Sequence, residues 1–242
     1  MLFCTYASSV WAHRLQENKS LALKLNRAQR TILLRMSGAY KTTPGEAINV
    51  ILGIRPLHLE AIKMAAQYWI KHENQIRATE ILREIPQDIK DIDNKINQIW
   101  QRNWQNSGKS RRLYGIIPMI EQRLKWTNWN PDKGSMHFLS GHGPYKSKLH
   151  ELKIVESPEC SCGQLSTPEH VVLHCPENHV KADGTVDARI VDLRNELKNV
   201  DIREIIEDDI KRTSLDLLAT IISYKEKEIY MRRMRRNIYD QE

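Results

Sequence analysis

The chain has 242 residues, 40% of them apolar, so it can bury a packed core without disulfide bonds. Lys and Arg outnumber Asp and Glu by 37 to 30, and the formal charge of +7 favours a polyanionic partner such as RNA or DNA about as well as it fits an ordinary solubilising surface. No stretch reaches the roughly 18 uninterrupted apolar residues of a membrane span, and the first residues lack the basic lead of a signal peptide, so we expect a soluble protein without membrane segments.

Apolar residues recur at helical spacing through most of residues 1–105, which predicts a helical first region. One series is predicted to line a single helix face that ends at Gly38: Leu21, Leu25, Ala28, Ile32 and Met36. Thr43, Pro44 and Glu46 then supply a cap, a first-turn proline and an acidic third residue, which predicts a short helix ending at Gly53.

A longer helix is predicted from about Pro56 through Ile70, with Pro86 as its limit. Another is predicted from the isoleucines at 89, 92, 96 and 99. We expect Trp100 and Trp104 to belong to the core rather than to a base-stacking platform.

Residues 106–134 are rich in glycine and proline and include the basic pair Arg111 and Arg112, so residues 106–157 are predicted to form an irregular basic linker and a helix. Arg111 and Arg112 are candidate nucleic-acid-binding residues that would contact phosphates. Trp126 and Trp129 in this segment fit tertiary packing better than base stacking. His137 and His142 are expected to have structural or surface roles.

Three of the four cysteines fall within sixteen residues, which is typical of a metal site in a reducing compartment and not of a disulfide framework. Residues 158–178 are predicted to form a zinc knuckle with the ligands Cys160, Cys162, His170 and Cys175. Gly163 permits the tight turn that two close thiolates need, and Ser166 or Thr167 can cap the helix that carries His170. With four protein ligands the zinc would be structural.

The fourth ligand is ambiguous from spacing. Positions 170 and 175 lie about 140° apart around an ideal helix, whereas His170 and His174 share a face. His174 is therefore a rival to Cys175, although Pro176 is expected to disrupt the last turn and so bring Cys175 within reach.

Residues 184–242 are predicted to be a helical, basic C-terminal region. Its last stretch carries cations that either contact phosphates or belong to a solvated helix face: Lys225, Arg232, Arg233, Arg235 and Arg236. Asp183, Glu196 and Lys198 imitate the acid…acid-x-Lys pattern of a metal-dependent nuclease, but the helical spacing around Glu196 favours a helix surface. Asp208 and Asp209 also fit a solvated helix face.

Several motifs in fixed order resemble one family. They include Tyr6 to Trp11, Gly38 to Thr43, Phe138 to Gly143 and the Cys160-to-Pro176 segment. Over roughly residues 6 to 178 the chain resembles the C-terminal part of a non-LTR retrotransposon polyprotein, from the branch that inserts into ribosomal DNA.

The resemblance implies a thumb-like region after the reverse-transcriptase palm, a linker and a Cys-Cys-His-Cys knuckle, and it favours Cys175 over His174. It implies RNA and DNA as partners, namely the element transcript and its target, an intracellular and nuclear location, and a parent that is an RNA-directed DNA polymerase and endonuclease using Mg²⁺. The aromatic-x-Asp-Asp turn that holds the polymerase metals does not occur in this sequence, so the chain itself is not expected to polymerise. The alternative to a nucleic-acid-binding segment is a domesticated zinc-dependent interaction module. The sequence does not indicate an oligomeric state.

Overall fold

The structure of the protein is a computed structural model, and it describes residues 5–86, 88–180 and 184–239. For Gln16 and residues 232–239 it describes the backbone alone. Its described residues form helices joined by turns, with two isolated β-bridges and no strand, which confirms the predicted mainly α fold. None of the described helices is both long and apolar enough to cross a membrane. The chain divides into two compact units, Met1–Met36 with Pro44–Asn128, and Ser37–Thr43 with Trp129–Glu242.

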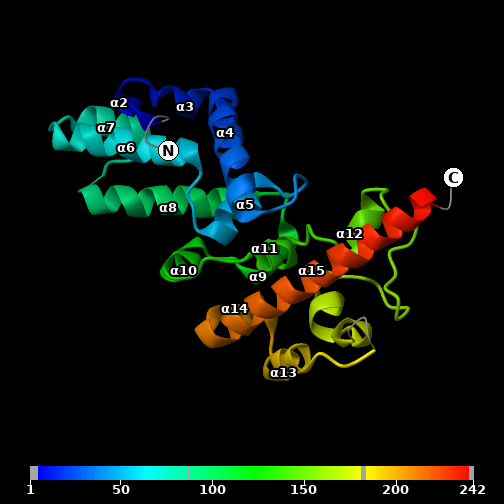
Figure 1. The fold of residues 1–242 in the computed structure, drawn as a ribbon. Coiled ribbons are helices and arrows are strands. Elements are labelled where there is room, and N and C mark those ends of the chain that lie inside the picture. The colour runs from blue at the N-terminus through cyan, green and yellow to red at the C-terminus, as the bar shows by residue number, and fades with distance from the viewer. Residues whose placement is uncertain (1–4, 87, 181–183, 240–242) are drawn as a thin grey trace. The chain divides into compact units, whose positions relative to one another are not determined.

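The first unit is a set of helices packed around α6 and α8 (Figure 1). Its elements are α2 (Ser8–Trp11), α3 (Arg14–Glu17), α4 (Lys19–Ser37), α5 (Gly45–Leu52), α6 (Leu57–Lys71), α7 (Gln75–Leu82), α8 (Ile89–Asn106), α9 (Arg111–Ile116) and α10 (Ile120–Lys125). Trp100 and Trp104 are buried in this core, as predicted. The segment expected as one long helix is broken after Lys71, because Glu73 has a positive φ of 56° and the Asn74 side chain caps α7.

Helix α4 turns a different face inward from the one its apolar series suggests. Gln29 and Leu33 are buried, whereas Ile32 and Met36 are 49% and 71% exposed. Gln29 bonds Asn49 and the backbone at Arg55 and Leu57, with distances of 2.8 to 3.2 Å. This polar anchor satisfies the buried amide, and it fixes the rotation of α4 against the turn between α5 and α6.

Residues 106–128 are packed rather than loose, because α8 holds them by side-chain hydrogen bonds. Trp104 donates to the carbonyl of Ile117 at 2.9 Å, and Gln101 bonds both the Pro118 carbonyl and the Ile120 amide. The buried Arg123 donates twice to the carbonyl of Ile51 at the end of α5. The boundary between the two units falls inside the predicted 106–157 segment.

The second unit is built on its long last helix. Its elements are α11 (Lys133–Ser140), α12 (Lys146–Glu151), the π-helix η1 (His170–His174), the 3₁₀-helix η2 (Pro176–His179), α13 (Ala188–Leu197), α14 (Ile202–Glu207) and α15 (Asp209–Tyr239). Helices α11, α13 and α14 and the π-helix pack against α15, which Figure 1 shows in orange and red. Gly134 lets α11 approach the α15 backbone at Ala219 and Thr220, where a Cβ atom would collide.

His137, Trp129 and Asp208 all make contacts within the second unit. His137 is buried and structural, as expected: its Nδ1 lies 2.9 Å from the Ser223 hydroxyl, and its ring contacts the Tyr40 ring at a tilt of 44°. Trp129 donates to the carboxylate of Asp216 at 2.6 Å, which confirms its packing role in the second unit. Asp208 accepts from two amides at the start of α15, so this acidic pair begins a helix.

Candidate metal centre

The first two cysteines of the knuckle lie on a tight turn. Glu159 and Leu165 form an antiparallel bridge, and the Cys160 amide donates to the Gln164 carbonyl at 2.7 Å. Gly163 closes this turn with a φ of 85°, a conformation that favours glycine. The predicted Gly163 turn is thus confirmed, and it brings the thiols of Cys160 and Cys162 to one side.

The other two candidate ligands lie on the helical turn that follows. The Thr167 hydroxyl accepts from the His170 amide at 3.1 Å, so Thr167 caps this turn and Ser166 does not. The Ser166 hydroxyl accepts instead from the Lys146 amide at the start of α12. The turn continues as a π-helix, in which the Cys175 amide donates to the His170 carbonyl at 2.6 Å.

The π-helix removes the geometric difficulty of a five-residue spacing. A π turn closes between residues five apart, so His170 and Cys175 come to the same side. Cys175 is fully buried in the cluster, whereas His174 is exposed and outside it. The structure therefore brings together the predicted four residues and selects Cys175 over the rival His174.

The ligand atoms have the separations of a tetrahedral metal site. The Sγ atoms of Cys160 and Cys175 lie 3.4 Å apart, and those of Cys162 and Cys175 lie 4.0 Å apart. His170 Nε2 lies 3.1 Å from Cys162 Sγ, and all four ligand atoms lie within 4.8 Å of one another. Tetrahedral zinc with bonds of about 2.3 Å to sulfur requires sulfur–sulfur separations of about 3.8 Å, so a small cation fits between these atoms.

The protonation chemistry of the cluster also fits a cation. Burial, together with the contact with Cys160, raises the pKa of Cys175 to about 12. Burial opposes ionisation of Cys160 as well, but hydrogen bonds from the Cys162 amide and the Cys175 thiol outweigh it and lower the Cys160 pKa. Burial lowers the pKa of His170, which keeps the imidazole neutral and able to donate its lone pair. Three crowded sulfurs resist becoming anions together unless a cation compensates them, and a bound metal ion does so.

A zinc ion held by three thiolates and one imidazole would have all four positions filled by protein. Such a site has no coordination position for a reactive water, so its contribution is to fold stability. The residues present therefore fit a structural zinc site.

Arg194 is a residue of this centre that sequence reasoning did not find. It extends from α13 and donates to the carbonyls of Val171, Val172 and Cys175 at 3.1, 2.9 and 2.7 Å. These are carbonyls of the π-helix and of the ligand that follows it. The guanidinium also brings positive charge next to a site of three thiolates, whose net charge with Zn²⁺ is negative.

Lys225 and Asn178 extend this support. Asn178 donates to the Val171 carbonyl at 3.0 Å, and Lys225 on α15 donates to the carbonyls of Asn178 and Val180 at 2.7 and 3.0 Å. Lys225 was one of the candidates for phosphate contact, and in the structure its ammonium links the 3₁₀-helix η2 to α15. The C-terminal helices thus hold the knuckle from two sides.

The other predicted phosphate contacts belong to α9 and to the last part of α15. Arg111 donates to the carbonyls of Gln105 and Ser107 near the end of α8 and stacks on Tyr114, and Arg112 lies beside it in α9 of the first unit. Arg232, Arg233, Arg235 and Arg236 belong to the last part of α15, where only the backbone is described. Their roles stay predictions.

The nuclease pattern is not assembled in the described residues. Asp183 lies outside them. Glu196 is on helix α13 and accepts from the Ser214 hydroxyl at 2.7 Å, while Lys198 follows the helix end. This agrees with the helix-surface interpretation, since the nuclease pattern needs its acid and lysine on a strand.

Comparison with known proteins places the chain near the proteins of one group of mobile elements. It is 29% identical over 181 residues to "Retrovirus-related Pol polyprotein from type-1 retrotransposable element R1 4" of Nasonia vitripennis, a match that covers 71% of this chain and 45% of that protein. It is 24% identical over 249 aligned residues to the "R1 3" polyprotein of the same organism, which covers 96% and 63% respectively. It is 26% identical over 182 residues to the R1 polyprotein of Bradysia coprophila, which covers 71% and 18%.

The chain spans less than half the length of the first of these relatives. No protein-family profile matches it, and no solved structure matches it. The resemblance that the sequence motifs predicted is confirmed by these relatives.

Proposed function

We propose that this chain, a homologue of the Pol polyproteins of R1-type retrotransposable elements, is a nucleic-acid-binding C-terminal part of such a polyprotein. Its partners are the RNA transcript of the element and the target DNA, and its place of action on DNA is the nucleus. The parent polyprotein is an RNA-directed DNA polymerase and endonuclease. This segment holds and positions nucleic acid for the parent, which supplies the polymerase carboxylates and their Mg²⁺.

The observation that carries the proposal is the cluster of Cys160, Cys162, His170 and Cys175. Zinc knuckles order a short segment that is too small to fold alone, and such modules commonly present their surface to single-stranded RNA or DNA. The formal charge of +7 supports a polyanionic partner. The basic end of α15 supports it too, because each neutralised phosphate releases counterions and adds affinity.

The experiment is a titration of fluorescein-labelled single-stranded RNA and DNA with the full chain loaded with zinc, repeated across a salt series. Affinity should fall steeply with salt, and a double Arg232→Glu and Arg233→Glu variant should reduce both affinity and slope. The control is a double Arg189→Glu and Arg203→Glu variant, which makes the same charge change at exposed positions of α13 and α14.

A flat salt dependence, or equal losses in the two double variants, would remove the proposal that the basic end of α15 contacts phosphate. An intact zinc site with no binding to either nucleic acid would favour the zinc-dependent interaction module instead.

A further inference from the structure

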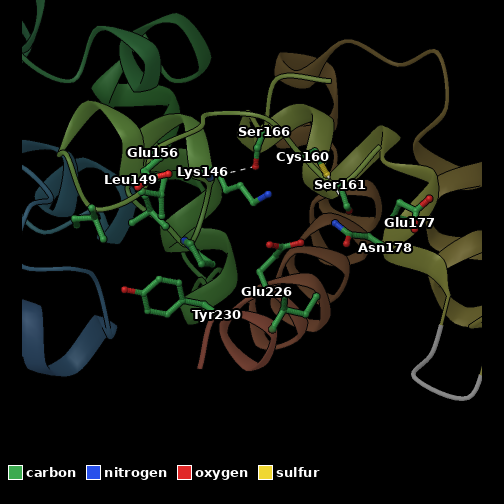
Figure 2. A pocket seen from close by; sticks show the side chains of 14 residues that line it. Lys146, Leu149, Glu156, Cys160, Ser161, Ser166, Glu177, Asn178, Glu226 and Tyr230 are labelled. Atoms are coloured by element: carbon green, nitrogen blue, oxygen red, sulfur yellow. Dashed lines mark hydrogen bonds between the residues drawn. The ribbon is translucent and has the colours of Figure 1, made fainter. Parts of the chain in front are cut away.

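A groove of about 520 Å³ lies next to the zinc cluster, within the second unit (Figure 2). Its walls come from α12 and the loop after it, from the knuckle, and from α15. Cys160 and Ser161 belong to the lining, so the metal centre forms part of one wall. The volume is within the range of roughly 300–1,000 Å³ typical of ligand sites in proteins.

Part of the lining is apolar and open to water. Leu149, Ile154 and Val155 come from the α12 side, and Ile229 and Tyr230 come from α15. Ile154 is 51% exposed and Ile229 is 40% exposed. Covering such surface stabilises a complex by about 25 cal/mol per Å² of apolar area, before the costs of association are subtracted.

The charges of the lining have the opposite sign to the charge of the whole chain. Glu156, Glu177 and Glu226 contribute three carboxylates, and Glu226 projects from α15 into the middle of the groove (Figure 2). Among the described side chains that line the groove, Lys146 is the one cation, and its ammonium donates to the Glu159 carbonyl at 2.7 Å. An acidic groove disfavours phosphate and favours a cationic partner by charge complementarity.

We propose that this groove binds a peptide segment of a protein partner, in which apolar side chains are flanked by Lys or Arg. The apolar side chains cover the surface formed by Ile154 and Ile229, and the cations face Glu156 and Glu177. The groove thus gives the chain a protein-binding function beside nucleic-acid binding. The proposal does not depend on nucleic-acid binding, because its contacts are the apolar and acidic residues of the groove and not the basic end of α15.

The test is fluorescence anisotropy of a labelled peptide, Gly-Leu-Arg-Arg-Leu-Ile-Lys-Arg-Leu-Gly, titrated with the full zinc-loaded chain. Binding should be saturable, with a dissociation constant in the micromolar range, and a matched peptide with Glu in place of each Arg and Lys should not bind. A double Glu156→Lys and Glu177→Lys variant should weaken binding at least about tenfold through lost complementarity. Ile154→Ser should weaken it as well, by removing apolar contact.

Matched controls use exposed residues of the same unit outside the groove. A double Asp192→Lys and Glu207→Lys variant repeats the charge change on α13 and α14, and Ile210→Ser repeats the loss of an exposed isoleucine on α15. Both controls should bind the peptide like the unmodified chain.

Three results would overturn the proposal: no binding of the basic peptide, equal binding by the groove variants and the unmodified chain, or equal losses in the groove and control variants. A parallel titration with labelled single-stranded RNA separates the two surfaces. Ile154→Ser should leave RNA affinity unchanged, and a loss of RNA affinity equal to the loss of peptide affinity would make the groove a nucleic-acid site instead. Failure of the proposed nucleic-acid function would appear only in the RNA titration.

Discussion

The amide of Cys175 donates to the carbonyl of His170 at 2.6 Å, five residues back along the chain. This π-type bond places the fourth ligand beside the third, where an α-helical turn would separate them. His174, the last residue of the π-helix, is exposed and lies outside the cluster. The choice of metal ligands therefore depends on one backbone hydrogen bond.

Replacing His174 and Cys175 one at a time should show which of the two is the fourth metal ligand. In the Co²⁺-substituted protein, His174→Ala should keep the visible absorption bands of tetrahedral cobalt bound to three thiolates, because His174 is outside the cluster. Cys175→Ser should weaken the sulfur-to-cobalt charge-transfer bands and lower metal affinity. The reverse pattern, with His174→Ala losing the bands, would assign the fourth position to His174.

Removal of Arg194 should destabilise the metal centre although Arg194 is not one of the candidate ligands. Arg194→Ala removes hydrogen bonds to three carbonyls beside the cluster, of which Val171 keeps its bond from Asn178, so we expect a loss on the order of 2 kcal/mol in unfolding free energy of the zinc-loaded chain. Urea denaturation measures this loss, and competition with a chromophoric chelator measures zinc affinity. Arg189→Ala on the same helix is the control, since its side chain is 75% exposed. Equal stability of the two variants would show that Arg194 does not support the centre.

The first unit should lose stability in mild acid through His58. Burial lowers the pKa of His58 to about 4, while its Nδ1 lies 2.9 Å from the Asn26 side-chain oxygen. Between pH 6.5 and about 4 the unfolded chain takes up a proton that the folded chain does not, so stability is present above this window and is lost as the pH falls through it. The loss attributable to His58 is up to about 3 kcal/mol.

Urea denaturation of the full chain at several pH values tests the role of His58. His58→Gln should flatten the pH dependence of the unfolding free energy in this window, whereas His13→Gln, at an exposed position of the same unit, should not. An unchanged slope in His58→Gln would contradict the prediction.

Close packing of α11 on α15 should make Gly134 intolerant of a side chain. A Cβ atom at this position meets the backbone of Ala219 and Thr220, which cannot move aside like a flexible side chain. Gly134→Ala should therefore cost roughly 3 kcal/mol or prevent folding of the second unit. Gly108→Ala is the control, because a Cβ atom there would have no neighbour within 4 Å. Thermal unfolding compares the two variants, and equal midpoints would show that the helices do not approach so closely.

The helical class and the cluster of three cysteines and one histidine could be predicted from sequence because both depend on local signals. Apolar spacing identified the helices, and the turn chemistry of Gly163 with the Cys-x-Cys pair identified the first half of the site. Spacing on an ideal helix could not decide between His174 and Cys175, since it assumes an α-helical turn where the chain forms a π-helix.

Other features depend on residues far apart in sequence. The rotation of α4 is set by the bonds of Gln29 to Asn49 and to the backbone at Arg55 and Leu57, which no helical periodicity contains. Arg194 supports the knuckle from α13, nineteen residues after Cys175, and its sequence neighbourhood resembles any charged helix. Such contacts are products of tertiary packing.

The central claim is a structural zinc site formed by Cys160, Cys162, His170 and Cys175. Zinc content of the purified full chain, combined with X-ray absorption at the zinc edge, tests it most directly. The account predicts one zinc per chain in a shell of three sulfurs and one nitrogen, lost in a double Cys160→Ser and Cys162→Ser variant and kept in Cys4→Ser. A chain with no tightly bound zinc, or a double variant that keeps its metal, would contradict it.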